Sequence, residues 1–173
     1  MIKCAVFLGN PGKEYEKTRH NAGFLLCDYL YGESSWQSKF HAFYITDGDL
    51  RILKPLTYMN LSGTSVSECA SFFKLRSDEI LVIHDDLELP LGEARLQKGG
   101  GTKGHNGVKS IRDRLGREDF MRLRIGIGKP VHGDTALYVT SPFTKDEMIT
   151  LTSLFSLIRR DWPLKSAEKV WKL

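Results

Sequence analysis

A histidine near the amino terminus and a carboxylate far along the chain are the residue types best suited to acid–base chemistry. His20 follows the loop after the first apolar run, and Asp85 follows a later apolar run at residues 80–83. A histidine that acts as a base needs a carboxylate that fixes its tautomer and stabilises the imidazolium. Because strands of one α/β sheet end at a common edge, His20 and Asp85 can meet there. A structural histidine and a loop-capping aspartate are the alternatives that these residues leave open.

Asparagine is the second notable residue type, because the chain has only four and each lies in or beside a loop after a strand. They are Asn10, Asn21, Asn60 and Asn106. Taken singly, an asparagine before Pro-Gly starts a turn, and Asn60 or Asn106 could cap a helix. Together, neutral amides at one sheet edge can hold an ester or a peptide backbone. No Gly-x-Ser-x-Gly motif and no loop cysteine beside a base is present, so water activated by His20 is the simplest nucleophile.

A glycine-rich loop at residues 99–107 resembles a phosphate loop but lacks the Lys-Ser or Lys-Thr ending, which argues against nucleotide hydrolysis. His105 in this loop is either a cap for the following helix or a substrate contact. The turn at residues 9–12 fails the dinucleotide pattern, because proline stands where the backbone should approach pyrophosphate. The His and Asp residues lack the spacing of a helical His-Glu-x-x-His site or a zinc knuckle. We therefore expect no metal and no cofactor.

Positive charge is concentrated in one segment, although the 173-residue chain has a net charge of only +4. Residues 95–129 contain ten Lys or Arg and three acidic residues, a balance of +7, which leaves the remainder at −3. The general interpretation is a solvated helix face. The more specific one is a phosphate-bearing partner such as a nucleic acid.

The elements that must position these residues alternate between strands and helices. Apolar runs predict strands at residues 3–8, 80–83, 93–97 and 123–127, and a hairpin of 40–45 with 50–53. Helical spacing predicts helices at 22–31, 62–74 with Ser62 as its cap, 106 or 107–115, 145–158 and 167–171. Residues 85–92 are expected to form a loop. This pattern predicts one α/β domain over residues 1–173, with a mixed, twisted sheet and helices on both faces.

The chain shows no sign of a membrane or secreted protein. Its apolar runs are far shorter than the ~20 residues of a membrane span, and the amino-terminal run stops at a turn. We expect a cytoplasmic location and no membrane partner.

Cys4, Cys27 and Cys69 have no paired spacing and are expected to be buried thiols. Without an obvious exposed apolar stripe, we expect a monomer.

Six ordered motifs together resemble the bacterial-type peptidyl-tRNA hydrolases, which cleave the ester between a peptide and its tRNA without a metal. The resemblance covers almost the whole chain and implies the same single α/β domain. It rests on Tyr15 and on residues 7–12 (FLGNPG), 18–23 (TRHNAG), 54–63 (KPLTYMNLSG), 84–87 (HDDL), 104–107 (GHNG) and 124–128 (RIGIG).

The resemblance implies a role for each of these site residues. His20 would be the catalytic base or would position the water, and Asp85 would hold His20. Asn10 and Asn106 would position the substrate carbonyl and the water, while Asn60 would bind the peptide backbone or the terminal ribose. The cleft for the peptide and the terminal adenosine would be lined by Tyr15, Tyr58, Met59 and His105.

The tRNA side departs from the family pattern. The family often has two basic residues on one strand face that clamp the tRNA 5′ phosphate. Here Arg95 fits, but Gln97 holds the second position and Lys98 should point to the other face. Lys103 replaces a small loop residue and could compensate. We expect contacts to acceptor-stem and 3′-end phosphates, without base reading, from Arg95, Lys103, Lys109 and Arg112.

Two other functions remain open at this stage. A non-catalytic RNA-binding module on the same fold would keep the basic segment but would not require His20, Asp85 and three amides together. A metal-dependent phosphoesterase could use the same His and Asp residues, and a chelator would reveal it.

Overall fold

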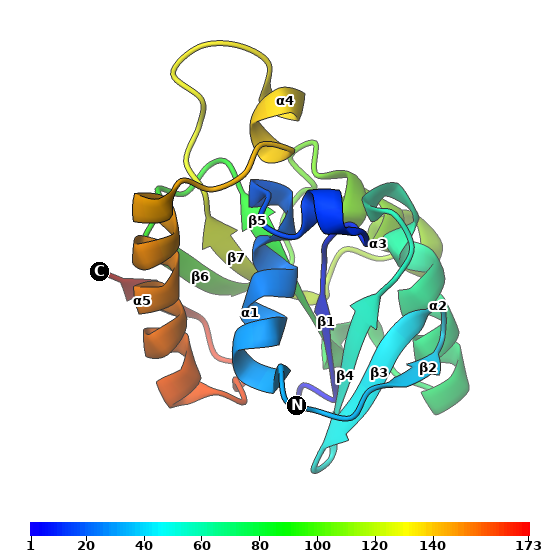
Figure 1. The fold of residues 1–173 in the computed structure, drawn as a ribbon. Coiled ribbons are helices and arrows are strands. Elements are labelled where there is room, and N and C mark those ends of the chain that lie inside the picture. Colours follow the sequence, from blue (N-terminus) through cyan, green and yellow to red (C-terminus); the bar gives the residue numbers. More distant parts are fainter.

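Eight strands form one mixed sheet at the centre of the structure, a computed structural model that describes residues 1–173 (Figure 1). Their order across the sheet is β2-β3-β4-β1-β5-β7-β6-β8. The strands are β1 (Cys4–Phe7), β2 (Gln37–Lys39), β3 (Ala42–Asp47), β4 (Leu50–Pro55), β5 (Ile80–Asp86), β6 (Glu93–Lys98), β7 (Met121–Gly126) and β8 (Lys169–Lys172). β1 pairs in parallel with β4 and β5, and β5 with β7, whereas the outer pairs are antiparallel. This topology confirms the predicted mixed sheet.

Helices cover both faces of the sheet, as predicted. They are α1 (Ala22–Tyr31), α2 (Ser62–Phe73), α3 (Asn106–Leu115), α4 (Thr135–Val139) and α5 (Lys145–Asp161), with short 3-10 helices η1 (Lys13–Tyr15), η2 (Arg19–Asn21), η3 (Met59–Leu61) and η4 (Ser77–Glu79). α1 and α5 pack on one face (Figure 1), in an apolar core that includes Phe7 and Phe155. α2 and α3 pack on the other face, in a core that includes Val6 and Ile111.

The pattern of burial along the strands explains why the sequence predicted most of them. β1 and the first four residues of β5 are buried on both faces and form continuous apolar runs, whereas β7 is buried at every residue but alternates apolar side chains with Arg122 and Arg124. β3 and β4 are joined by Gly48 and Asp49, and the positive φ of Gly48 suits this tight turn. The predicted hairpin is therefore confirmed.

β5 extends beyond its apolar run, and the extension includes two carboxylates. Asp85 and Asp86, expected in a loop, are the last residues of β5 and pair with Ile125 and Gly126 of β7. Backbone pairing with β7 continues the strand through polar residues, which an apolar run does not signal. Because side chains alternate along a strand, the two carboxylates point to opposite faces of the sheet.

The prediction of a carboxyl-terminal helix at residues 167–171 is wrong. Residues 169–172 form β8, which pairs antiparallel with β6 and buries Trp171. The free edge of β6 supplies hydrogen-bond partners to β8, and local helical preference cannot compete with this pairing.

Three local features also differ from expectation. Ser62 is the first residue of α2 and not its cap; its hydroxyl donates to the carbonyl of Met59, and Leu61 holds the cap position. β2 and α4 were not predicted, because both are short and neither has a clear apolar period.

The cysteine prediction is confirmed, since Cys4, Cys27 and Cys69 are buried and free. None of the helices combines the length and the apolar character needed to cross a membrane.

Candidate active site

The predicted histidine and carboxylate meet at the carboxyl edge of the central strands. His20 lies in η2, directly before α1, and Asp85 is near the end of β5. α1 approaches the sheet closely because Gly23 has no side chain: a Cβ atom there would lie 2.5 Å from the Leu8 carbonyl oxygen and 2.8 Å from that of Ile83. This close approach brings η2 against β5.

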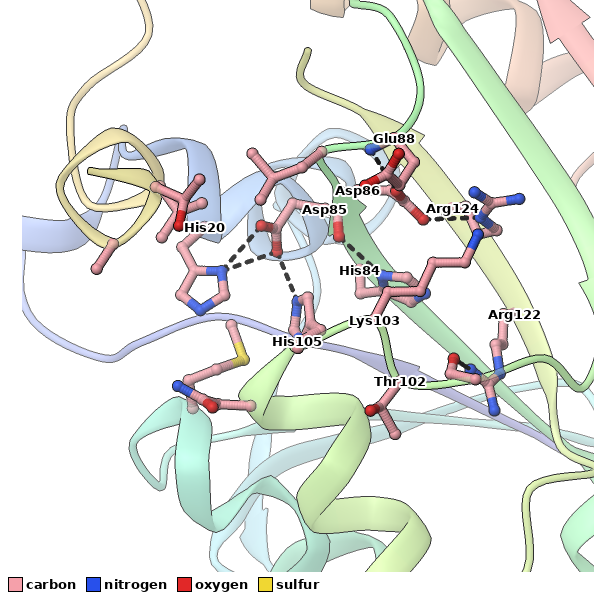
Figure 2. Close-up of a pocket in the computed structure, with 18 of the residues that line it drawn as sticks. His20, His84, Asp85, Asp86, Glu88, Thr102, Lys103, His105, Arg122 and Arg124 are labelled. Atoms are coloured by element: carbon pink, nitrogen blue, oxygen red, sulfur yellow. Dashed lines mark hydrogen bonds and ion pairs between the residues drawn. The ribbon is translucent and has the colours of Figure 1, made fainter. Parts of the chain in front are cut away.

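His20 and Asp85 form a hydrogen-bonded pair (Figure 2). Nδ1 of His20 lies 3.0 Å and 2.9 Å from the two carboxylate oxygens of Asp85. An ionised carboxylate only accepts, so Nδ1 carries the proton and the neutral ring keeps a free lone pair on Nε2. Burial lowers the pKa of His20, but the charge of Asp85 and its hydrogen bond raise that pKa overall. The arrangement can therefore accept a proton at Nε2 and stabilise the resulting imidazolium.

His105 holds the other side of the same carboxylate. Its Nε2 lies 2.9 Å from an oxygen of Asp85, while its Nδ1 accepts from the backbone N–H groups of Gly107 and Val108. His105 is thus the cap of α3, one of the two roles that the sequence left open, and it also lines the cavity. Since Nδ1 accepts from helix donors, the proton of the neutral ring is on Nε2 and points at Asp85.

The two imidazole donors keep Asp85 ionised. Burial favours the protonated form, but the charges of His20 and His105 and their hydrogen bonds hold the pKa of Asp85 well below its usual range. Asp85 is 2% exposed, so solvent screens these interactions little.

His84, the first residue of the HDDL motif, is a further histidine beside the site and is buried. Its Nδ1 lies 2.8 Å from the backbone carbonyl of Asp85, and its Nε2 has no hydrogen-bond partner. Burial, followed by the nearby His105, lowers the pKa of His84 to about 4. His84 is therefore neutral near pH 7, and its ring packs 5.0 Å from that of His105.

Of the four asparagines, Asn10 and Asn21 are hydrogen-bonded to each other, and three, Asn10, Asn60 and Asn106, line the cavity. The side chain of Asn21 binds both backbone groups of Asn10, at 2.8 Å and 3.0 Å. The side-chain oxygen of Asn10 accepts from the backbone N–H of Met59 at 2.7 Å. Its amide nitrogen has no partner within the protein, so Asn10 offers a fixed donor. Asn60 and Asn106 are exposed and line the cavity.

His20, Asp85 and His105 line one end of a cavity of about 450 Å³, and Arg122 and Arg124 line the other end (Figure 2). Figure 2 shows His20 on one side of Asp85, with Lys103, Arg122 and Arg124 on the opposite side. Arg122 donates to the backbone carbonyls of Gly101 and Glu118, and it also lines the cavity. A further wall comes from α4 and the residue after it: Thr135, Ala136, Val139 and Thr140.

Arg124 is held between two side chains at this end. Its Nε lies 2.7 Å from Asp86, and its Nη1 donates to Gln97 at 2.8 Å. Gln97, which stands at the second clamp position of the family pattern, thus orients an arginine. The sequence analysis missed Arg122 and Arg124 as site residues. Their alternation within an apolar strand is the signal that could have found them, since it places both on one face.

Lys103 is the only one of the four expected tRNA-contact residues that lines the cavity. Its backbone has a φ of 49°, in the left-handed region that favours glycine. The other three lie on the outer surface, where Arg95 pairs with Glu93 and Arg112 pairs with Asp113, while Lys109 is exposed on α3.

Of the residues expected to line the cleft, some line the cavity and others lie outside it. Met59 lines the cavity beside Asn10. Tyr15 and Tyr58 lie outside it and pack edge to face against each other, with ring centres 6.5 Å apart.

Three ligand-type atoms, from His20, Asp85 and His105, lie within 4.8 Å of one another and form the cluster best placed to bind a metal. A metal on Nε2 of His105 would displace its proton to Nδ1, which would then face the N–H donors of α3. The hydrogen bonds of His105 therefore fit a proton-handling network better than a metal site.

Comparisons with known proteins point to one family. A family model described as peptidyl-tRNA hydrolase matches residues 4–170. Relatives called peptidyl-tRNA hydrolase include one from Geotalea daltonii, 44% identical over 88% of this chain and 84% of the relative. Another, from Citrifermentans bemidjiense, is 47% identical over 86% of this chain and 83% of its own. A solved peptidyl-tRNA hydrolase from Acinetobacter baumannii is 35% identical, with a TM-score of 0.82 over 90% of this chain and 83% of that chain. The chain therefore belongs to the peptidyl-tRNA hydrolase family of enzymes, as its ordered motifs predicted.

Proposed function

We propose that the protein hydrolyses the ester bond of peptidyl-tRNA without a metal, and releases a free peptide and a free tRNA. The observation that carries this proposal is the His20–Asp85 pair, whose unprotonated Nε2 is the group left to accept a proton. His20 takes a proton from a water as the water attacks the ester carbonyl carbon. The ester bond then breaks, and the proton passes from His20 to the ribose oxygen that leaves.

The amide of Asn10 stabilises the charge that develops on the carbonyl oxygen. Its side-chain oxygen is occupied by the N–H of Met59, so its nitrogen is held as a donor. One well-placed donor of this kind contributes about 10²- to 10³-fold in rate. Asn106 positions the water, and Asn60 binds the peptide backbone or the terminal ribose.

The arginine end of the cavity binds the nucleic acid part of the substrate. Arg122 and Arg124 are permanently charged, and Lys103 lies beside them in the lining. They contact phosphates near the 3′ end, while Arg95, Lys109 and Arg112 on the outer surface contact the acceptor stem. These contacts do not read bases, so the enzyme acts on many peptidyl-tRNAs.

The test is hydrolysis of an N-acetyl-aminoacyl-tRNA in excess chelator, with the parent protein and His20→Ala compared side by side. We expect fast cleavage by the parent and a loss of about 10²- to 10⁴-fold in the variant. Loss of the parent activity in chelator would contradict metal independence. Binding without cleavage by the folded parent would support the RNA-binding module instead, and cleavage unaffected by His20→Ala would exclude His20 as the base.

A further inference from the structure

Arg19 is a buried charged residue to which the proposed function assigns no role. It directly precedes His20 in η2 and is only 8% exposed. A guanidinium keeps its charge at every working pH, so burying it is costly unless its donors have partners. The partners of Arg19 therefore indicate which part of the protein it holds in place.

Every partner of the Arg19 side chain lies in residues 138–147, which include the end of α4 and the start of α5. Its Nη1 donates to the backbone carbonyls of Tyr138 at 3.4 Å and Ser141 at 3.3 Å. Its Nη2 pairs with Glu147 at 2.8 Å. The guanidinium also lies 4.2 Å from the centre of the Tyr138 ring. Arg19 thus attaches α4 and α5 to η2.

α4 has few other attachments to the rest of the protein. It contains no buried residue, and residues 131–137 are all exposed, so apolar burial contributes little to its position. Figure 1 shows α4 (yellow) beyond the carboxyl edge of the sheet. Apart from the contacts of Arg19, one hydrogen bond joins α4 to the sheet side, from the hydroxyl of Tyr138 to the carbonyl of Ile127 at 2.7 Å.

The position of α4 matters because α4 forms one wall of the catalytic cavity. Thr135, Ala136 and Val139 line the same cavity as His20, and α4 lies on the His20 side of it (Figure 2). A shift of α4 relative to η2 would change the space in which the ester must meet His20. A displacement of about 1 Å between reacting groups can lower a rate by about 10²-fold.

We propose that Arg19 is a positioning residue for the hydrolysis, because it fixes the α4 wall of the cavity to the element that carries His20. This inference rests on the proposed function. Arg19 does not itself line the cavity, so its effect on the reaction must pass through α4.

The main experiment compares Arg19→Gln with the matched control Arg159→Gln. Arg159 makes contacts of the same kind, since it donates to the carbonyl of Tyr29 and lies 4.2 Å from the centre of that ring, but it joins α5 to α1 outside the cavity. For an N-acetyl-aminoacyl-tRNA, we expect kcat/KM to fall by about 10- to 100-fold in Arg19→Gln and to stay within about twofold of the parent in Arg159→Gln. All rates are measured well below the Tm of each variant.

Amide hydrogen exchange gives a readout that does not depend on activity. Exchange of residues 135–141, followed by mass spectrometry, should be faster in Arg19→Gln than in the parent and unchanged in Arg159→Gln. This measurement reports the attachment of α4 directly.

Glu147→Gln is a milder variant that tests the same attachment if Arg19→Gln does not fold. A glutamine keeps an oxygen for the backbone N–H of Thr144, which Glu147 accepts at 2.8 Å, but it loses the charge that pairs with Arg19. We expect kcat/KM to fall by about threefold. Added to Arg19→Gln, the substitution should cause no further loss, because both remove the same pair.

Three outcomes would contradict these expectations. A lower Tm with unchanged kcat/KM in Arg19→Gln would show that Arg19 only stabilises the fold, and would overturn the inference. A loss of kcat/KM without faster exchange in residues 135–141 would also overturn it, since the effect would not pass through α4. Failure of the parent to cleave the substrate would instead overturn the proposed function, while the exchange measurement would still test the attachment of α4.

Discussion

Two carboxylates that are adjacent in the sequence serve opposite ends of the same cavity. Asp85 accepts from two imidazoles, those of His20 and His105. Asp86 binds the guanidinium of Arg124, which keeps its charge at every working pH. The alternation of side chains along β5 separates the two, so one strand end supplies both a proton-handling pair and a fixed charge pair.

The comparison teaches that the partner, and not the residue type, decides the function of an aspartate. The partners lower the pKa of both carboxyls, although burial acts in the opposite direction on each. Asp85 is paired with His20, an imidazole that can accept a proton at its free Nε2, whereas Asp86 is paired with the guanidinium of Arg124, which has no such atom. We therefore expect the two residues to respond differently to the same substitution.

The largest expected effect is that of Asp85→Asn. An amide at this position can donate to His20 and thereby select the wrong tautomer, so we expect kcat to fall by about 10³- to 10⁴-fold. Asp86→Asn is the matched control on the neighbouring residue and should keep kcat within about threefold of the parent. Single-turnover rates with saturating substrate measure both. Equal losses in the two variants would remove the distinction between the carboxylates.

Arg124→Gln tests the other end of the cavity and should act mainly on KM. Loss of a charged contact to a phosphate should raise KM by about tenfold and change kcat little. The dependence of KM on salt should also become weaker, because fewer counterions are released on binding. Steady-state kinetics at low and moderate salt give both values, and a melting curve verifies that the variant is folded. A fall in kcat at constant KM would place Arg124 in the chemical step.

The pH dependence of kcat/KM tests the proposed role of the His20–Asp85 pair. Asp85 raises the pKa of His20 above its usual value of 6.5, and protonated His20 cannot act as a base. Activity should therefore fall as the pH decreases through a pKa above 6.5. In Asp85→Asn, the residual activity should show this decline at a lower pH, since the carboxylate charge is gone and burial then dominates. An acid limb at the same pH in both proteins would contradict the coupling.

The smallest expected effect separates the two roles of His105. His105→Ala removes the cap of α3, and we expect Tm to fall by about 2–4 °C. His105→Asn keeps a capping oxygen and should retain most of the Tm, although it also loses the parent contact to Asp85. Thermal unfolding and kcat of both variants measure the two roles separately. A Tm loss of the same size in both would show that the contact with Asp85, and not the cap, stabilises the protein.

Much of the fold was predictable because many of its strands and helices follow from patterns within short segments of the sequence. β1 and residues 80–83 of β5 are buried on both faces and form unbroken apolar runs, and α1 and α3 have apolar residues at helical spacing, so periodicity identified them. The carboxyl-terminal strand was not predictable in this way. Residues 169–172 adopt β structure because the edge of β6 lies beside them, and no local pattern encodes that neighbour.

The proposed site residues also divide into those that the sequence indicated and those that only the structure revealed. Residue types and ordered motifs alone pointed to His20, Asp85 and the asparagines as the residues proposed for catalysis and positioning, because proton transfer and amide donation require those chemical groups. Only the tertiary structure revealed that Asp85 has a second imidazole partner in His105, and that Gln97 orients Arg124. These partners come from separate elements of the chain. Their contacts depend on strand register and on close helix packing, which exist only once the sheet has formed.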